Sequence, residues 1–242
     1  MRIPVYVAVA WLAIAVEAGA QSSPYSVWRH VVAVGATGKK LESDEFRGRR
    51  PNGDTVETFT GLRRRLHSES HGIEVDIDDT LKITTTMGSG SGETPLDRRD
   101  CREGGDPEKP VRPEDVKVIL GFKVIRVMSA NAIMQDERWQ APDLNCEELE
   151  RMVHFFENGQ PDGYTLYTAT KAVAAAPDEN MYAVPDGALE MPTSRYLWFV
   201  GKSPTRAHDQ KVQAMADATY ARQLAQRQAA GVTLDVFKRT GP

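Results

Sequence analysis

The stretch IEVDID, residues 73–78, alternates apolar and acidic side chains without a break. Successive side chains of a β-strand point to opposite faces, so Ile73, Val75 and Ile77 share one face and the three carboxylates share the other. The pattern predicts a strand with one buried and one solvated face, as strands of antiparallel sheets have.

Strand-forming runs continue on both sides of this stretch. Residues 26–34, SVWRHVVAV, stop at Gly35, and residues 81–87, LKITTTM, follow an acidic pair at 78–79. The turn residues Pro51, Asn52 and Gly53 separate two further extended runs, the second over 54–68. We expect a meander of antiparallel strands.

The second half of the chain predicts more strands. Residues 116–127, VKVILGFKVIRV, predict one buried strand with a bulge or kink at Gly121, and 131–140 predict its partner. Asn145 is placed to cap a short helical turn over 145–149. The turn residues NGQPDG at 158–163 predict a hairpin between 151–156 and 164–173.

The two ends of the chain differ from this β-rich middle. Residues 1–20 have the positive start, the apolar run and the Ala18-Gly19-Ala20 cleavage signature of a signal peptide, with an uncleaved anchor as the alternative. Residues 203–242 predict an α-helix and tail, because Ser203-Pro204 suits a helix start and 205–230 lack Gly and Pro. Its apolar stripe is narrow, so we expect a solvated helix, with a lid or a partner-binding helix as the alternative.

We therefore expect an exported protein, periplasmic or extracellular, with an antiparallel β domain over 21–202 and a long loop at 88–113. In an oxidising compartment the two cysteines, Cys101 and Cys146, are most simply one disulfide. Closing the loop of about 45 residues between them stabilises the folded state by about 4 kcal/mol in the chain-entropy model. A redox or metal pair is the alternative, but it usually has closer spacing such as C-x-x-C.

The composition narrows the classes of partner. Among 242 residues, 30 basic side chains face 34 acidic ones, for a net charge of −4, which gives no sign of nucleic-acid binding. The 40% hydrophobic fraction is enough for a core. No segment after the signal peptide is long and apolar enough to span a membrane. We expect no cofactor.

One cluster suggests a metal ion or a hydrolytic site. His67, Glu69 and His71 share a face if the segment is extended, but the two histidines are then roughly 13 Å apart at ~3.3 Å rise per residue. Zinc needs its ligands within about 2.2 Å, so a turn would be required. The favoured interpretation is exposed polar positions at a strand end, and a hydrolase site near His67 and His71 is the alternative.

Four other patterns are weaker. The acidic residues of 74–79 do not match an EF-hand, and the glycines of 35–40 are too close for a phosphate loop. The motif GSGSG at 88–92 has Gly90 where a nucleophile elbow requires serine. The basic run Arg63-Arg64-Arg65 is expected to pair with carboxylates such as Glu69 or Glu74.

A resemblance covers residues 119–194. It is carried by RWQAPDLNC at 138–146, by the FFENGQPDGYTLYTATKAV hairpin at 155–173 and by YAVPDGALEMPTS at 182–194. These segments resemble a family of uncharacterised exported bacterial proteins of the acidobacterial type. The order of strands, hairpin and closing segment also resembles the periplasmic lipoprotein-carrier half-barrel. That likeness implies a curved antiparallel sheet around an apolar hollow, but no binding residue of that family matches here.

The predicted fold is mainly β with α: a curved antiparallel sheet or half-barrel with a C-terminal α-helix. No catalytic group emerges from the motifs, so we expect a non-catalytic binding or envelope-associated protein with a hydrophobic, lipid-like or amphipathic ligand on its concave side. The alternatives are the hydrolase above and a protein-interaction module that uses the C-terminal helix.

Overall fold

The computed structural model describes residues 23–59, 63–68, 70–87, 101, 111–192 and 207–237. The predicted signal peptide, most of the predicted 88–113 loop, Glu69 and the predicted helix start at Ser203-Pro204 lie outside these residues.

The first half of the chain forms a six-stranded meander. Its strands are β1 (Tyr25–Gly35), β2 (Lys40–Arg49), β3 (Thr55–Phe59), β4 (Arg63–Ser68), β5 (Ile73–Asp78) and β6 (Ile83–Met87). Each strand pairs antiparallel with the next. The meander is confirmed, and the extended run over 54–68 is two paired strands.

The second half is another meander. It comprises the 3-10 turn η1 (Pro113–Asp115), β7 (Val116–Ile119), β8 (Phe122–Ala130), β9 (Met134–Ala141), the 3-10 turn η2 (Pro142–Leu144), β10 (Glu147–Glu157) and β11 (Gln160–Val173). The hairpin between β10 and β11 is confirmed.

Two sequence expectations in this half are wrong. The run over 116–127 is not one kinked strand, because Leu120 and Gly121 take positive φ values of 51° and 86° and turn the chain back on itself. Residues 145–149 are not helical, because Asn145 and Cys146 are left-handed and Glu147 already pairs with Ala141.

The rest of the chain completes the sheet and crosses its edge. It contains the 3-10 turn η3 (Glu179–Tyr182), β12 (Leu189–Glu190), α2 (Ala207–Ala229) and the 3-10 turn η4 (Leu234–Phe237). The C-terminal helix is confirmed. Glu190 accepts a hydrogen bond from the Arg227 guanidinium at 2.5 Å and from the Thr86 hydroxyl at 2.8 Å, so β12 ties the end of α2 to β6.

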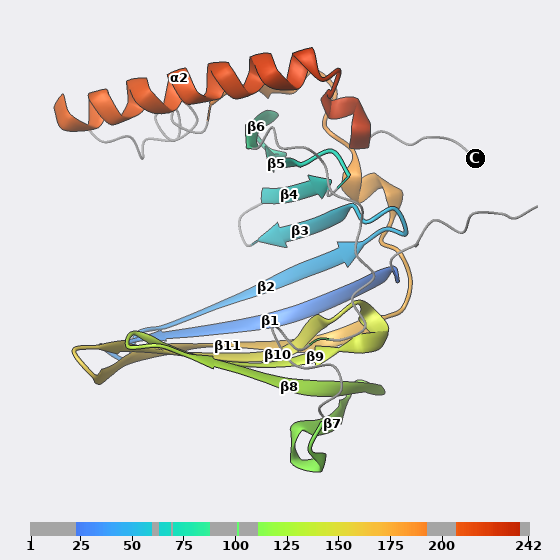
Figure 1. Ribbon diagram of the computed structural model, residues 1–242, viewed down its shortest axis with the longest axis vertical. Coiled ribbons are helices and arrows are strands. Elements are labelled where there is room, and N and C mark those ends of the chain that lie inside the picture. Colours follow the sequence, from blue (N-terminus) through green and yellow to red (C-terminus); the bar gives the residue numbers. More distant parts are fainter. Residues whose placement is uncertain are drawn as a thin grey trace, which may run out of the picture.

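The twelve strands of the described residues belong to one sheet, in the order β12-β6-β5-β4-β3-β2-β1-β11-β10-β9-β8-β7. Among these strands, only β12 and β6 pair in parallel. Figure 1 shows that the long central strands form the lower part, that β3 to β6 rise from them and that α2 crosses the top. This strongly curved, open sheet confirms the predicted fold class.

Two buried clusters stabilise the sheet. Phe46, Val56, Leu66, Val75 and Ile77 pack against Tyr182 and Phe237, which come from η3 and η4. A second cluster gathers at the β8–β10 end and contains Tyr25, Val27, Val124, Trp139, Ala141, Leu144, Leu149 and Ala169. Within the described residues, no helix is both long and apolar enough to cross a membrane.

Candidate functional site

The sheet has two faces of different character. Phe46, Val56, Leu66 and Val75 lie on one face, which η3 and η4 cover, and we call it the packed face. Alternation along β1 puts Trp28 on this face, opposite Phe46, and puts Arg29, Val31 and Ala33 on the other. We call that second surface the open face.

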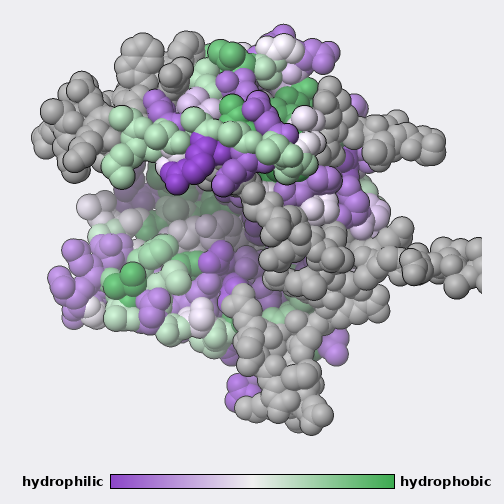
Figure 2. All heavy atoms as spheres, turned by 45° about the horizontal axis from the view of Figure 1, so that its top comes forward, coloured by the Kyte–Doolittle hydropathy of each residue, from purple (hydrophilic) through white to green (hydrophobic). Residues whose placement is uncertain are grey.

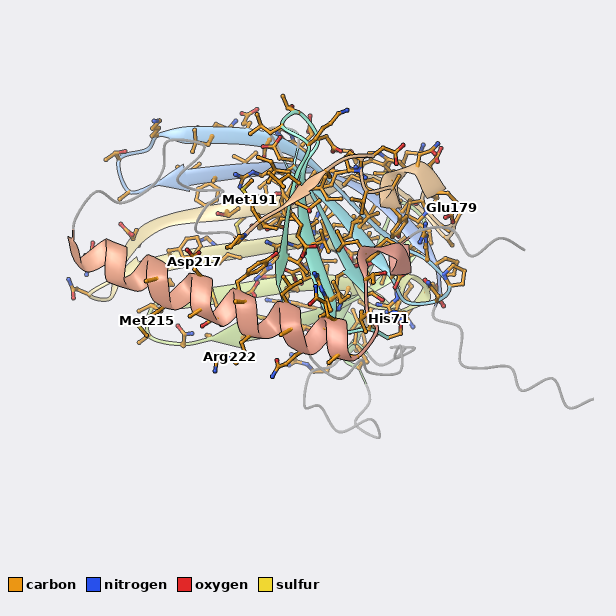
Figure 3. All side chains as sticks on the ribbon, turned by 90° about the horizontal axis from the view of Figure 1, so that it is seen from above. His71, Glu179, Met191, Met215, Asp217 and Arg222 are labelled. Carbon is orange, nitrogen blue, oxygen red and sulfur yellow. A yellow bond between two sulfur atoms is a disulfide. The ribbon has the colours of Figure 1, made fainter. Side chains whose placement is uncertain are left out.

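The open face borders a recess. Figure 1 shows η3 and η4 at one end of β3 to β6, whereas the N-terminal part of α2 projects away from them, above the long strands. The surface is hollowed below α2, with hydrophilic and hydrophobic residues around the hollow (Figure 2). Seen from above, α2 crosses over the sheet with Met215, Asp217 and Arg222 along its length (Figure 3).

A row of alternating charges crosses the open face. Arg47, Glu57, Arg65 and Asp76 are consecutive register partners on β2, β3, β4 and β5. The Arg47 Nε donates to Glu57 at 2.6 Å and the Arg65 Nε donates to Asp76 at 2.8 Å. Each charge therefore has an opposite charge beside it, which suits the partly exposed part of this face on β2 to β5. On β1, Val27, Arg29 and Val31 of the same face are buried.

The row leads to a buried carboxylate, Glu147. It accepts a hydrogen bond from the Tyr25 hydroxyl at 2.7 Å and lies 3.7 Å from Arg29 and 3.5 Å from Arg47. Burial, together with the charge of Glu147, raises the pKa of the Tyr25 phenol well above its ordinary value. Burial likewise raises the pKa of the next carboxyl, Glu148. This end of the face is polar and shielded from water.

An aromatic ring lies beside two guanidinium groups further along the face. Arg29 and Arg151 lie over the Tyr167 ring, 5.5 and 5.7 Å from its centre. Arg151 also binds Asp136 through two hydrogen bonds of 3.0 and 2.9 Å. These side chains are held in place by stacking and by ion pairs, so they present a preorganised polar surface.

The same face becomes apolar toward the hairpin ends of the strands. Leu41, Ala33, Thr165 and Val153 follow one another in register across β2, β1, β11 and β10. Leu41 is exposed, whereas Val153 and its β9 partner Asp136 are buried. Phe155 and Met134 form the next pair outward. The open face therefore carries most of its charge at its inner end and mostly apolar groups, apart from Asp136 and the Thr165 hydroxyl, at its outer end.

The predicted metal or hydrolase residues lie at the β4–β5 turn. His67 is in register with Glu74, and His71 contacts Ser68 and Ser70 through Nδ1 at 3.0 and 2.9 Å. No group of three or more His, Cys, Asp or Glu able to hold a metal occurs among the described residues. Glu69 lies outside them. The hydrolase alternative stays a prediction.

The remaining expected contacts can be located. Cys101 and Cys146 lie at disulfide distance, with their Cα atoms 5.2 Å apart. Arg65 pairs with Glu74 at 3.3 Å, as expected, and Arg64 binds Asp79 through two hydrogen bonds. Glu147, Tyr167 and Arg151 were missed by sequence reasoning. The sequence indicated that Tyr167 and Arg151 belong to strands. It could not show that they lie near Arg29 of β1, because that depends on the pairing of β1 with β11.

The protein is thus an open, curved, mainly antiparallel sheet, and its concave open face carries both polar and apolar side chains. No family model and no curated protein matches this chain.

Solved structures match it at low identity. PNGF-II shares 13% identity at a TM-score of 0.44, over 74% of this chain and 33% of that one. This chain therefore spans about a third of the length of PNGF-II.

A domain of an outer membrane lipoprotein-sorting protein from Vibrio parahaemolyticus shares 10% identity at a TM-score of 0.30, over 65% of this chain and 88% of that one. A LolA-superfamily protein from Nitrosomonas europaea shares 3% identity at a TM-score of 0.34, over 67% and 90% of the two chains. The expected lipoprotein-carrier proteins are thus among the structural neighbours, and the likeness is one of fold alone. Nothing in these matches points to the acidobacterial-type family.

Proposed function

We propose that this protein is an exported, non-catalytic binding or carrier protein whose open face holds an amphipathic ligand. The observation that carries the proposal is the gradient along this face, from the charges around Glu147 to the mostly apolar row of Leu41, Ala33, Thr165 and Val153.

The two ends of the gradient suit the two parts of such a ligand. Burial of a hydrocarbon chain gains about 0.8 kcal/mol per CH₂ group, and the outer row offers apolar side chains for that purpose. A polar head needs hydrogen-bonding partners when water is displaced, and the partly exposed guanidinium groups of Arg47 and Arg151 can supply them.

The cysteine pair supports a location outside the cytoplasm. Disulfides persist in oxidising compartments and are rare where thiols are kept reduced. A pair at a Cα distance of 5.2 Å, in a chain whose start has the features of a signal peptide, is compatible with export.

A displacement assay tests the proposal. The protein is loaded with a fluorescent fatty acid and challenged with dodecanoate, dodecyltrimethylammonium and dodecyl maltoside, each below its micellar concentration. We expect saturable binding and displacement by at least one of the three. Failure of the protein to bind the fluorescent fatty acid would overturn the proposal.

A matched pair of variants locates the site. Thr165 lies on the open face opposite Ala33, whereas Thr168 lies opposite His30 on the other face of the same strand. We expect Thr165→Glu to weaken binding by about tenfold or more, because a charge then lies beside the hydrocarbon chain. Thr168→Glu should bind like the wild type. Equal losses in both variants would place the ligand elsewhere.

A further inference from the structure

The hairpin ends of three strand pairs meet at one end of the sheet. Figure 1 shows the turns between β1 and β2, β8 and β9, and β10 and β11 together at the free end of the long strands. Residues 127–134, VMSANAIM, form the β8–β9 turn and its flanks and contain no charged residue. Ile133 at this turn is 67% exposed.

Two of these hairpins share one apolar surface. Met134 is the register partner of Phe155, and the Phe156 N–H donates to the Ile133 carbonyl at 2.9 Å. We call Met128, Ile133, Met134, Phe155 and Phe156 the tip patch. Leu41, which is also exposed, follows the neighbouring β1–β2 turn.

The tip patch is apolar on both faces of the sheet. Alternation from Val153 puts Phe155, with its partner Met134, on the open face and Phe156 on the opposite face. Met128 is opposite Glu137, on the same face as Phe156. A protein partner that packs on a sheet covers one face, whereas a fluid hydrocarbon layer surrounds a wedge on both.

Electrostatics contribute little at this end of the molecule. The chain has a net charge of −4, and Lys40, which precedes Leu41, is paired with Glu42. The β10–β11 hairpin adds the acidic residues Glu157 and Asp162. Attraction to anionic lipids needs a basic cluster, and the tip patch has none. Any attraction to a membrane must therefore come from insertion of apolar side chains.

We propose that the tip patch inserts into the surface of a phospholipid bilayer. This inference goes beyond ligand binding on the open face and does not depend on it. Because Phe155 lies on the open face, one pair outward from the row that contains Val153, docking would bring that face to the membrane surface.

Vesicle co-sedimentation tests the inference with charge-matched variants of the full chain. The test variant is Ile133→Asp with Phe155→Asp. The control is Val118→Asp with Leu120→Asp, at the far end of the sheet. The exposures match, at 67% and 41% for the test positions and 69% and 46% for the control positions.

We expect wild type and control to bind neutral phosphatidylcholine vesicles and vesicles with added phosphatidylserine equally well. The test variant should bind both about tenfold more weakly or not at all, because carboxylates replace inserted side chains. Circular dichroism spectra that match the wild type show that the variant is folded.

Three outcomes would overturn the inference: absence of wild-type vesicle binding, equal losses in test and control variants, or binding that requires phosphatidylserine. A wild-type dimer in light scattering that the test variant abolishes would also overturn it, by assigning the patch to a second copy. Fatty-acid binding without vesicles is measured in parallel, so failure of the membrane inference stays distinct from failure of the proposed function.

Discussion

Glu147 shows how a single carboxylate can organise the open face. Glu147 lies buried at the start of β10, with 6% of its surface exposed. It contacts Tyr25 of β1 and Arg47 of β2, which are far away in the sequence. A buried charge is tolerated when its partners satisfy it, and loss of one partner leaves the others uncompensated. Glu147 therefore has more influence on stability than an exposed ion pair.

We predict that Glu147→Gln destabilises the fold by about 3 kcal/mol, because Arg29 and Arg47 lose a buried counter-charge. Urea unfolding followed by circular dichroism measures this. Tyr25→Phe, which removes one hydrogen bond and no charge, should cost about 1 kcal/mol. A Glu147→Gln variant as stable as wild type would contradict the prediction.

The neighbouring Glu148 predicts a pH effect of known sign. Burial raises its pKa above the ordinary value of 4.5, so the folded state binds a proton more tightly than the unfolded state. As the pH rises from the unfolded value through the raised folded value, ionisation costs stability.

Glu148→Gln should accordingly stabilise the protein at neutral pH, and the gain should shrink as the pH falls through the raised folded pKa and vanish below about 4.5. Thermal unfolding of both proteins across this range is the measurement. A variant that is less stable than wild type at pH 7 would show that the Arg151 contact outweighs the cost of burial.

At the scale of elements, the contact between β1 and β11 joins the two meanders. Gly163 sits in this contact with a φ of 135°, and a Cβ there would lie 2.3 Å from the Val34 carbonyl oxygen. Its register partner Gly35 has no atom within 4 Å of such a Cβ. Close approach of the two strands thus requires glycine at only one of the two positions.

Gly163→Ala should destabilise the protein by about 2 kcal/mol or more, because both the clash and the backbone conformation are unfavourable. Gly35→Ala is the control and should have little effect. Chemical denaturation compares the two, and equal stabilities would mean that β11 shifts without cost.

The helix α2 is attached to the sheet near its C-terminal end. Arg227 is buried and bound to Glu190. Burial, together with the charge of Glu190, raises the pKa of Tyr220. Glu190→Ala removes the carboxylate with which both Arg227 and Tyr220 interact. We expect faster hydrogen exchange in α2 with little change in β1, measured by mass spectrometry. Unchanged exchange in α2 would show that η4 alone holds the helix.

At the scale of the whole molecule, the Cys101–Cys146 pair connects the segment after β6 to the turn before β10. The two residues are 45 positions apart, and closure of such a loop stabilises by about 4 kcal/mol in the chain-entropy model.

The double variant Cys101→Ser with Cys146→Ser should lose about this amount of stability. Reductant should lower the melting temperature of the wild type and leave that of the double variant unchanged. A wild-type melting temperature that does not respond to reductant, with thiols shown to be free, would contradict the prediction.

Local sequence signals predicted most of the strands. Alternation at 73–78 and the turn residues at 51–53 and 158–163 act over a few residues, so they were sufficient for the first meander and the last hairpin. The errors at Leu120-Gly121 and Asn145-Cys146 have one cause. Non-glycine residues there adopt left-handed conformations that propensity does not favour, and pairing with a neighbouring strand holds them there.

The amino-acid sequence alone determined that this chain is mainly β, that its helix follows the sheet and that its two cysteines are candidates to pair, because these properties depend on periodicity and composition. The order of strands, the convergence of Glu147 with Tyr25, Arg29 and Arg47, and the apolar tip were decided by tertiary structure. The physical reason is register. A shift of one residue between β1 and β11 would move every side chain of the shifted strand to the opposite face. The register that prevents this results from contacts between segments more than a hundred residues apart.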